Sequence, residues 1–373
     1  MKIGHGRHCL SPEGEFHLIG YRSPNRMEPA AGIHDDIYGN SLLMDQDGKQ
    51  IFLFSADFLE FEEGMAEDVK TLFSTRYGID RDCVLLSATH NHSSVVSYHK
   101  GWYTGKFDLS YYGFLIDTIC RAYEECAGNM QEATARYGRA VISGYYGNRN
   151  HPGENADNEV IVVEFFDRSG AAFAGMVNWA VHSTVISADN TWLTGEWAGN
   201  VCRKLGEGLG FYPLMMVGAA GDCSNRNQRQ GNDFKELERV SAGMAEEIMK
   251  IPVQKPLELG EIRCQTLFHT IHHDGFHLDA KASLIQSGKL QLFVFPGELG
   301  SKFGIQLKAA CLDLGLVCGY TNGYYEYFLP REEYGLSFET AESQIPKGEP
   351  EKLIEKFIQA SELLKNSSNE NSR

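Results

Sequence analysis

The chain has 373 residues, 42% of them hydrophobic and 23% charged, a composition typical of a globular protein that buries a sizeable core. Its formal net charge is −16, because 50 acidic residues outweigh 34 basic ones. Such a surface repels nucleic-acid phosphates and anionic bilayers. We therefore expect no nucleic-acid partner and no stable membrane association, while a homo-oligomer stays open.

The strand and helix patterns alternate in the first third of the chain. Buried strands are expected at 51–58 and 84–88, and helices at 64–77 and 114–130. In the middle, strands are expected at 136–145, 160–166, 175–181 and 214–217, and helices at 196–209 and 233–250. In the last third, strands are expected at 261–272, 290–295 and 316–328, and helices at 298–314 and 351–365.

This order of elements predicts one large α/β domain over 1–365, with a mixed β-sheet core flanked by helices. The polar segment NSSNENSR, 366–373, is expected to be a disordered tail. The nine cysteines contain no CxxC pair, and a chain of this length needs no disulfides, so free thiols are expected. The N-terminus lacks an apolar stretch of signal-peptide length, and nothing approaches a membrane span. These features predict a cytoplasmic protein.

The segment Thr89-His90-Asn91-His92-Ser93 directly follows the apolar run 84–88. Residues two apart in a strand point to the same side, so His90 and His92 are expected to converge at the end of a strand. Paired imidazoles suit a divalent transition metal, zinc above all. HxH alone is a weak signal, because one exposed histidine and one hydrogen-bonded core histidine explain it equally well.

Other polar residues also follow strand-like runs. His182 ends NWAVH, Ser224 lies in the glycine-rich GAAGDCSN, and Glu298 follows FVFPG. Each has a structural explanation: a core histidine, a tight turn, and a glutamate favoured at a helix start. Arg149, in GNRNHP, is suited to orient a polar or anionic group. Tyr327 ends a tyrosine-rich run that is more typical of core and rim aromatics.

Taken in order, these segments resemble the N-terminal catalytic domain of the neutral/alkaline, non-lysosomal ceramidases. The family's THTHS corresponds to ATHNHSS, its asparagine–arginine pair to Asn148-Arg149, and its second histidine segment to NWAVHS. Its GDxSxN-type turn corresponds to AAGDCSNRN, its PGE segment to FPGE, and its tyrosine-rich strand before EEY to YYEYFLPREEY. The six motifs span roughly positions 30–345 and identify a superfamily better than a substrate.

The resemblance implies one catalytic zinc ion per chain, bound by His90, His182, Glu298 and Tyr327. It places His92 beside the metal, Arg149 against the substrate, and Ser224 as a hydrogen-bonding group. The implied activity is zinc-dependent hydrolysis of amide (N-acyl) bonds, in which metal-bound water attacks the carbonyl. His92 is expected to relay the proton or to hold the oxyanion.

The chain departs from the family pattern in three places. The aromatic hydroxyl that follows the family's ligand tyrosine has no counterpart at Ser337-Phe338-Glu339. The segment after His182 carries Trp192 and Trp197 where the family is rich in Asn, Ser and Asp. The immunoglobulin-like domain and export signal usual in ceramidases are not expected here, nor is a calcium site at that junction. A small polar amide is therefore favoured over ceramide.

Several alternatives stay open. The same site chemistry serves a zinc hydrolase of ester or phosphoester bonds. A barrel-type metal-dependent amidohydrolase also uses HxH, but the strand-rich middle of the chain argues against its eight βα repeats. A non-catalytic binding protein on a degenerate ceramidase fold is the third alternative. Asp57 is either a partner of a ligand histidine or a turn aspartate.

Overall fold

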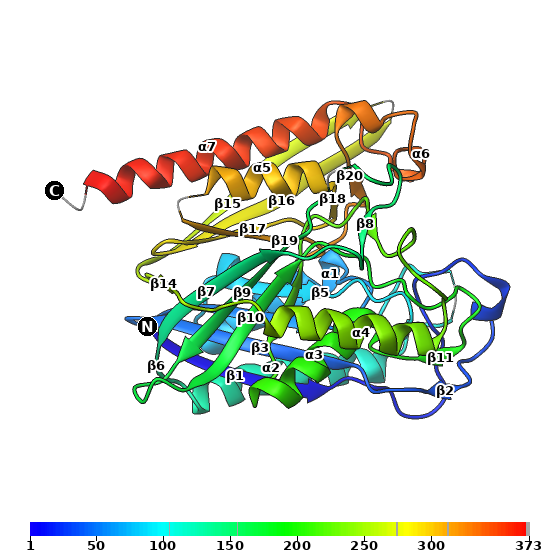
Figure 1. Ribbon diagram of the computed structural model, residues 1–373, viewed down its shortest axis with the longest axis horizontal. Helices are drawn as coiled ribbons and strands as arrows, with labels where there is room; N and C mark the ends of the chain where they lie inside the picture. The colour runs from blue at the N-terminus through cyan, green and yellow to red at the C-terminus, as the bar shows by residue number, and fades with distance from the viewer. Residues whose placement is uncertain (104, 155, 274, 312, 371–373) are drawn as a thin grey trace.

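The computed structural model describes residues 1–103, 105–154, 156–273, 275–311 and 313–370, with side chains inside the last helix described to 364. These residues build three mixed β-sheets, and a pair of helices lies beside each sheet (Figure 1). Among the described residues, no helix combines the length and apolar character needed to cross a bilayer. The predicted α/β class with a mixed-sheet core is confirmed.

The first sheet has the strand order β5-β4-β3-β1-β6. Its strands are β1 (Lys2–Cys9), β3 (Tyr38–Gln46), β4 (Lys49–Ala56), β5 (Val84–Ala88) and β6 (Gln131–Glu132). Strands β4 and β5 run parallel, and the other neighbours run antiparallel. Helix α1 (Glu63–Tyr77) ends at Gly78 in the left-handed conformation, and Asp108 caps the N-terminus of α2 (Leu109–Gly128).

The second sheet has the order β12-β10-β9-β7-β14. Its strands are β7 (Thr134–Val141), β9 (Glu159–Phe166), β10 (Ala172–Trp179), β12 (Leu214–Val217) and β14 (Lys255–Leu257). Strands β10 and β12 are parallel, and the rest pair antiparallel. Helices α3 (Glu196–Leu209) and α4 (Phe234–Met249) pack against each other beside this sheet (Figure 1).

The third sheet has the order β15-β16-β17-β19. Its strands are β15 (Ile262–His273), β16 (Phe276–Ser287), β17 (Leu290–Val294) and β19 (Leu314–Cys318). Here too the last pair, β17 and β19, is parallel. Helices α5 (Ser301–Ala310) and α7 (Glu349–Glu370) cover this sheet at the top of Figure 1.

Short elements complete the described fold. Three two-stranded pairs join β2 (Gly32–Ile33) to β11 (Trp192–Leu193), β8 (Gly147–Asn148) to β13 (Cys223–Ser224), and β18 (Glu298–Leu299) to β20 (Tyr327–Phe328). The remaining short helices are η1 (Pro24–Arg26), η2 (Arg81–Cys83), η3 (Arg331–Glu333) and α6 (Phe338–Glu342).

The three sheets meet at the carboxyl ends of their parallel pairs. The Ala88 amide at the end of β5 donates to the Tyr320 carbonyl after β19 at 3.0 Å, and the Gly319 amide donates to the Val217 carbonyl of β12 at 2.9 Å. The buried Asn178 amide donates to carbonyls of both β12 and β19, at 3.0 and 2.8 Å. Loops that leave all three sheets therefore enter one region, the position where α/β proteins most often bind ligands.

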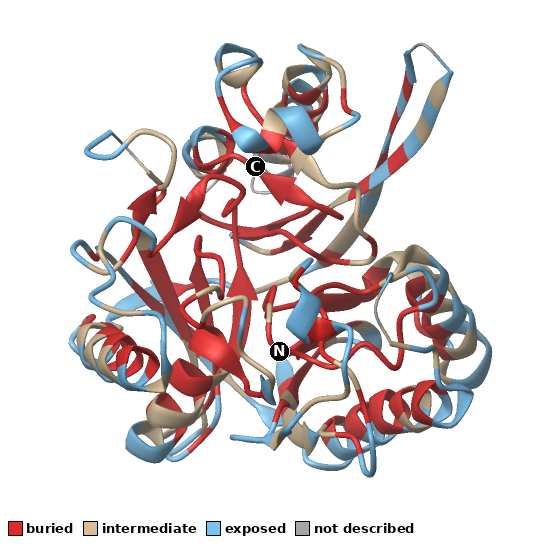
Figure 2. Ribbon diagram, turned by 90° about the vertical axis from the view of Figure 1, so that its right-hand side faces the viewer, coloured by how far each residue is buried: buried red, intermediate tan, exposed pale blue. Residues whose placement is uncertain are grey.

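The strands carry most of the core, as Figure 2 shows by their burial, while the outward faces of the helices are exposed. One hydrophobic core takes residues from all three sheets, and a second core lies between the third sheet and helices α5 and α7. Trp197, in the segment that departs from the family pattern, packs edge-on against Trp179 with ring centroids 5.5 Å apart. Its role is structural.

Several local expectations are corrected. The helix expected at 298–314 begins at Ser301 and ends at Ala310, because Glu298 pairs with β20. The strand expected at 316–328 ends at Cys318 and gives way to turns. The expectation of nine free thiols is wrong, since Cys83 and Cys264 form a disulfide. Helix α7 continues to Glu370, and residues 371–373 of the expected disordered tail lie outside the described residues.

Candidate metal centre

A cavity of about 980 Å³ opens where the three sheets meet. It is lined by all seven residues that the sequence singled out: His90, His92, Arg149, His182, Ser224, Glu298 and Tyr327. These residues come from the loops after β5, β8 and β10 and from the short strands β13, β18 and β20. The fold thus brings together side chains from His90 to Tyr327, 237 positions apart in the chain.

The two histidines of the HxH segment converge, but strand alternation is not the reason. Strand β5 ends at Ala88, and His90 has a left-handed backbone with φ of 56°. The Asn91 side chain fixes this turn by donating to the Asp57 and Thr194 carbonyls at 3.1 and 2.7 Å. As a result, the Nε2 atoms of His90 and His92 lie 3.0 Å apart.

His182 follows β10 and brings the third imidazole. Its backbone amide donates to the Cys223 carbonyl at 3.0 Å, which ties the loop after β10 to the glycine-rich turn after β12. The His90 and His182 rings meet edge-on with centroids 4.6 Å apart. One ring nitrogen from each of the three histidines lies within 4.8 Å of the others.

The second nitrogen of each ring reveals the proton arrangement. Nδ1 faces a backbone carbonyl in every case: Leu59 for His90 at 3.0 Å, Gly20 for His92 at 2.8 Å and Ala220 for His182 at 2.7 Å. A carbonyl oxygen only accepts, so each Nδ1 carries the proton and each Nε2 presents a lone pair. Burial lowers the pKa of His90 to about 3 and that of His92 well below its usual value, so these two rings are neutral.

Glu298, in β18, supplies a buried carboxylate to the same point. Its oxygens lie 3.5 Å from His90 Nε2 and 2.9 Å from His182 Nε2. The Tyr320 and Tyr324 hydroxyls donate to the two oxygens at 3.1 and 2.5 Å. Burial opposes ionisation, but the Tyr324 hydroxyl donates to the carboxylate and favours its charged form, and the pKa of Glu298 is held well below its usual range. The carboxyl group is therefore ionised.

This arrangement fits a divalent cation. Three Nε2 lone pairs and a carboxylate converge with no proton between them, and the 2.9 Å contact of His182 Nε2 with Glu298 does not have hydrogen-bond geometry. Lone pairs and negative charge at such distances repel unless a positive ion lies among them. Imidazole nitrogens with one carboxylate are a ligand set that zinc accepts.

Arg149 lies beside this centre in a buried ion pair with Glu339. Its Nε donates to Glu339 at 2.5 Å, and its Nη2 donates to the Gly221 carbonyl at 2.8 Å and to the Tyr327 hydroxyl at 3.3 Å. Asn150 donates to the other Glu339 oxygen at 2.9 Å. Tyr327 therefore contacts Arg149, whereas the hydroxyls that contact Glu298 belong to Tyr320 and Tyr324.

The remaining candidates have clear surroundings. The buried Ser224 Oγ accepts a hydrogen bond from the Arg226 amide at 3.3 Å, and no imidazole of the described residues contacts it. Asp222 accepts from the amide and hydroxyl of Ser301, both at 2.8 Å, and so holds the start of α5. Asp57 accepts from the Tyr38 amide at 2.9 Å and from Thr89 at 3.4 Å, so it is a turn aspartate and not a partner of a histidine.

Sequence reasoning missed the two tyrosines that bind Glu298 and the acid that pairs with Arg149. Tyr320 and Tyr324 lie in the same tyrosine-rich run as Tyr327, so the run signalled the group without identifying its members. Glu339 lies at the place where the family hydroxyl is absent. Only the fold shows that this glutamate meets an arginine almost two hundred residues earlier.

Comparison with known proteins gives a consistent result. The family model described as neutral/alkaline non-lysosomal ceramidase, N-terminal, matches residues 2–205. The chain is 25% identical over 300 residues to the neutral ceramidase of Pseudomonas aeruginosa, a match that covers 70% of the chain and 43% of that relative. It is 26% identical over 222 residues to neutral ceramidase A of Dictyostelium discoideum, covering 53% of the chain and 30% of the relative. The matched part thus spans less than half the length of these relatives.

Solved structures share the fold at lower identity. A ceramidase solved as a complex with C2 superposes with a TM-score of 0.85 over 98% of this chain and 75% of its own, at 16% identity. The crystal structure of the neutral ceramidase from Pseudomonas aeruginosa gives a TM-score of 0.82 over 96% of this chain and 73% of its own, at 17% identity. Both matches extend across all three sheets and establish the fold.

Proposed function

Because the chain belongs to the neutral/alkaline non-lysosomal ceramidase family, we propose that it is a zinc-dependent hydrolase of amide (N-acyl) bonds. The observation that carries this proposal is the convergence of three imidazole lone pairs and the Glu298 carboxylate on one point in a large cavity. His90, His182 and Glu298 are the ligands that we assign to the ion. Tyr327 remains our candidate for the fourth ligand. Tyr324, whose hydroxyl contacts Glu298, is the alternative.

Zinc held in such a site lowers the pKa of water and polarises a carbonyl oxygen. His92 is suited to take up a proton at Nε2, because its Nδ1 proton is already committed to the Gly20 carbonyl. The same side chain, once protonated, returns that proton to the departing amine. Its neutral resting state follows from burial, which lowers the pKa of His92.

Arg149 and Ser224 position the substrate in this scheme. Glu339, the Gly221 carbonyl and Tyr327 occupy Nε and Nη2 of Arg149, which leaves Nη1 to meet a substrate oxygen in the cavity. Ser224 uses its oxygen to accept from the Arg226 amide, so its hydroxyl proton is free to donate to substrate. Without a base in contact, direct attack by this serine is the weaker assignment.

The first test is metal content, measured by mass spectrometry on the wild-type protein, His182→Ala and Ser224→Ala. We expect about one zinc ion per wild-type chain, loss of zinc in His182→Ala and retention in Ser224→Ala. A panel of N-acyl amides, with ester and phosphoester substrates beside them, then identifies the bond. Retention of zinc in His182→Ala or its loss in Ser224→Ala contradicts the ligand assignment. Full occupancy without turnover of any substrate contradicts the hydrolase.

A further inference from the structure

Two arginines line the metal cavity without a partner. Arg226 and Arg229 follow Ser224 closely, and both are exposed at the cavity wall. Among the described residues, neither guanidinium takes part in a hydrogen bond or an ion pair. Glu236, the acid whose charge Arg229 influences, is already bound by Arg239 through two contacts of 2.8 and 2.6 Å. Both positive charges are therefore available to a ligand.

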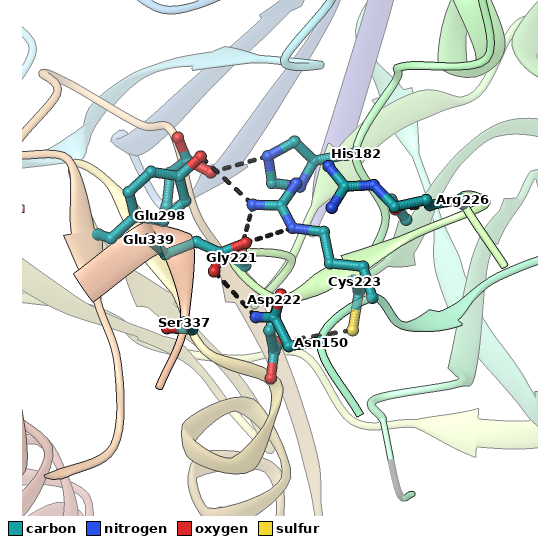
Figure 3. A network of polar contacts seen from close by, with 12 residues as sticks. Asn150, His182, Gly221, Asp222, Cys223, Arg226, Glu298, Ser337 and Glu339 are labelled. Atoms are coloured by element: carbon teal, nitrogen blue, oxygen red, sulfur yellow. Dashed lines mark hydrogen bonds and ion pairs between the residues drawn. The ribbon is translucent and has the colours of Figure 1, made fainter. Parts of the chain in front are cut away.

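The backbone presents the two arginines together. The Asn225 carbonyl accepts from the amides of Gln228 and Arg229, both at 2.9 Å, which closes a tight turn. Residues three apart in such a turn lie on one side of it. Figure 3 shows the Arg226 side chain reaching from this turn toward His182. Arg229 lines the same cavity as Arg226 and the metal centre.

Asn225 supplies an independent observation. Its side chain lines the cavity and is almost wholly buried, yet neither the amide nitrogen nor the amide oxygen has a partner among the described residues. A buried amide without partners costs free energy, so such groups are rare in folded proteins unless a ligand satisfies them. Asn225 directly precedes Arg226, and its carbonyl accepts from the Arg229 amide, so its side chain adds a neutral donor and acceptor to the part of the cavity wall that carries both arginines.

Most of the other charged residues that line the cavity have partners, and Glu342 is an exposed acid without an ion pair among the described residues. Arg149 pairs with Glu339, Glu60 with His99 at 2.8 Å, and Glu298 belongs to the metal centre. The Arg22 guanidinium lies over the Tyr103 ring, 5.9 Å from its centroid. The unsatisfied positive charge is therefore concentrated at Arg226 and Arg229, on a protein whose net charge of −16 otherwise repels anions.

We propose that Asn225, Arg226 and Arg229 bind the carboxylate of the substrate, and that the substrate is an N-acylated amino acid. The inference rests on the proposed hydrolase and names its substrate class. Paired guanidinium groups match a carboxylate in planar, charge-assisted hydrogen bonds. An amino-acid carboxylate lies one carbon from the amide nitrogen, and the proposed anion site begins at Asn225, directly after Ser224, in the same cavity as the metal centre.

The reaction balances with water alone. The acyl carbon gains an oxygen from water, the carbon–nitrogen bond breaks, and the nitrogen leaves with a proton as a free amino acid. The carboxylate at Arg226 and Arg229 keeps its charge throughout, so the pair binds substrate and product amine alike. The two arginines should therefore make the enzyme prefer a substrate that has the carboxylate over one that lacks it.

The test compares hexanoylglycine with hexanoylglycinamide, which differ by one carboxylate. We expect the wild-type enzyme to favour the acid in kcat/KM, and the ratio between the two substrates to fall about 10–100-fold in Arg226→Gln/Arg229→Gln. When Arg226→Lys takes the place of Arg226→Gln in the double variant, the positive charge is kept without the planar pair of donors, and part of the ratio should return. Arg168→Gln, an exposed arginine in the turn between β9 and β10, is the matched control and should leave the ratio unchanged.

A binding measurement separates this inference from the hydrolase itself. The probe is the ketone in which a methylene group replaces the amide nitrogen of hexanoylglycine, titrated by calorimetry. If its Kd rises about 10–100-fold in the double variant while no amide is hydrolysed, the anion site stands and the hydrolase fails. If amides are hydrolysed but neither the ratio nor the Kd changes, the anion site is refuted. If the enzyme prefers N-hexanoyl phosphoethanolamine over hexanoylglycine, the site binds a phosphate, and the assignment of a carboxylate is refuted.

Discussion

Replacing Glu339 by glutamine leaves the Arg149 guanidinium buried without a carboxylate. The two side chains are 1% and 6% exposed, and their closest atoms lie 2.5 Å apart. Glutamine keeps the shape and can still accept one hydrogen bond, but it removes the compensating charge. Breaking a buried ion pair from one side costs about 3–5 kcal/mol, because the remaining charge stays desolvated.

The expected thermal shift follows from the size of the protein. An unfolding entropy of roughly 2.1 cal/mol/K per residue gives about 0.8 kcal/mol/K for the chain, so Tm falls by roughly 4–6 °C. The loss depends on pH. Burial would raise the pKa of Glu339, but Arg149 and Asn150 hold it below the usual value of 4.5. Its stabilisation is therefore complete above pH 4.5 and disappears as the pH falls through the lower folded value.

Urea unfolding at neutral and acidic pH measures this effect. The control is Glu342→Gln, the same substitution on the same short helix at an exposed glutamate without an ion pair among the described residues. It should change the unfolding free energy by less than about 0.5 kcal/mol. A Glu339→Gln protein within that margin at neutral pH, or a loss that persists in acid, would refute the assignment of this pair.

Three further predictions concern other parts of the fold. Burial raises the pKa of Glu196 to about 7. As the pH rises from 4.5 toward 7, the unfolding free energy of the wild-type protein should therefore fall by up to about 1.4 kcal/mol per pH unit relative to Glu196→Gln. Urea unfolding across that range measures the difference, and parallel stability curves would contradict the prediction. Gly39→Ala should lose about 1–3 kcal/mol, because the new methyl group would lie 2.1 Å from the Phe54 ring. Its counterpart Gly113→Ala, in α2 with nothing within 4 Å, should gain about 0.5–1 kcal/mol in the same assay. Cys264→Ser opens a disulfide that spans 181 positions and should lose about 2–5 kcal/mol. Thiol titration of the denatured proteins should then find eight thiols in this variant against seven in the wild type, and nine thiols in the wild type would exclude the disulfide.

The sequence predicts the strands and helices whose own residues carry the pattern. Strand β5, helix α3 and strand β12 have the predicted bounds. Strand β1, KIGHGRHC, was not foreseen, because glycine, histidine and arginine have little strand preference and only pairing with β3 and β6 makes the segment extended. Glu298 was assigned to a helix start for a similar reason. Its strand conformation depends on a hydrogen bond from its backbone amide to the Glu326 carbonyl, which is distant in sequence.

In the site as well, residues within recognisable motifs were predicted, and residues that act only through contacts between distant segments were not. The order of the motifs predicts His90, His182 and Glu298 as members of one site, and the fold places them together. The convergence of His90 with His92 was expected from strand alternation but results from a left-handed turn, which no local pattern reveals. The groups that were overlooked, such as Tyr324 and Glu339, act through contacts between segments. Their sequence neighbourhoods carry no separate signal.

The order of the ligands along the chain has a consequence for synthesis. Glu298 follows His90 by roughly 200 residues, so at about 5–20 residues per second the nascent chain carries its first imidazoles for roughly 10–40 s before the carboxylate is made. During that interval the strands of the first two sheets are complete, whereas the third sheet still lacks β19. Glu298 itself lies in β18, whose partner β20 follows later still. The protein therefore closes its metal centre as one of the final acts of folding, and a nascent chain arrested before β17 keeps the histidines without their acid.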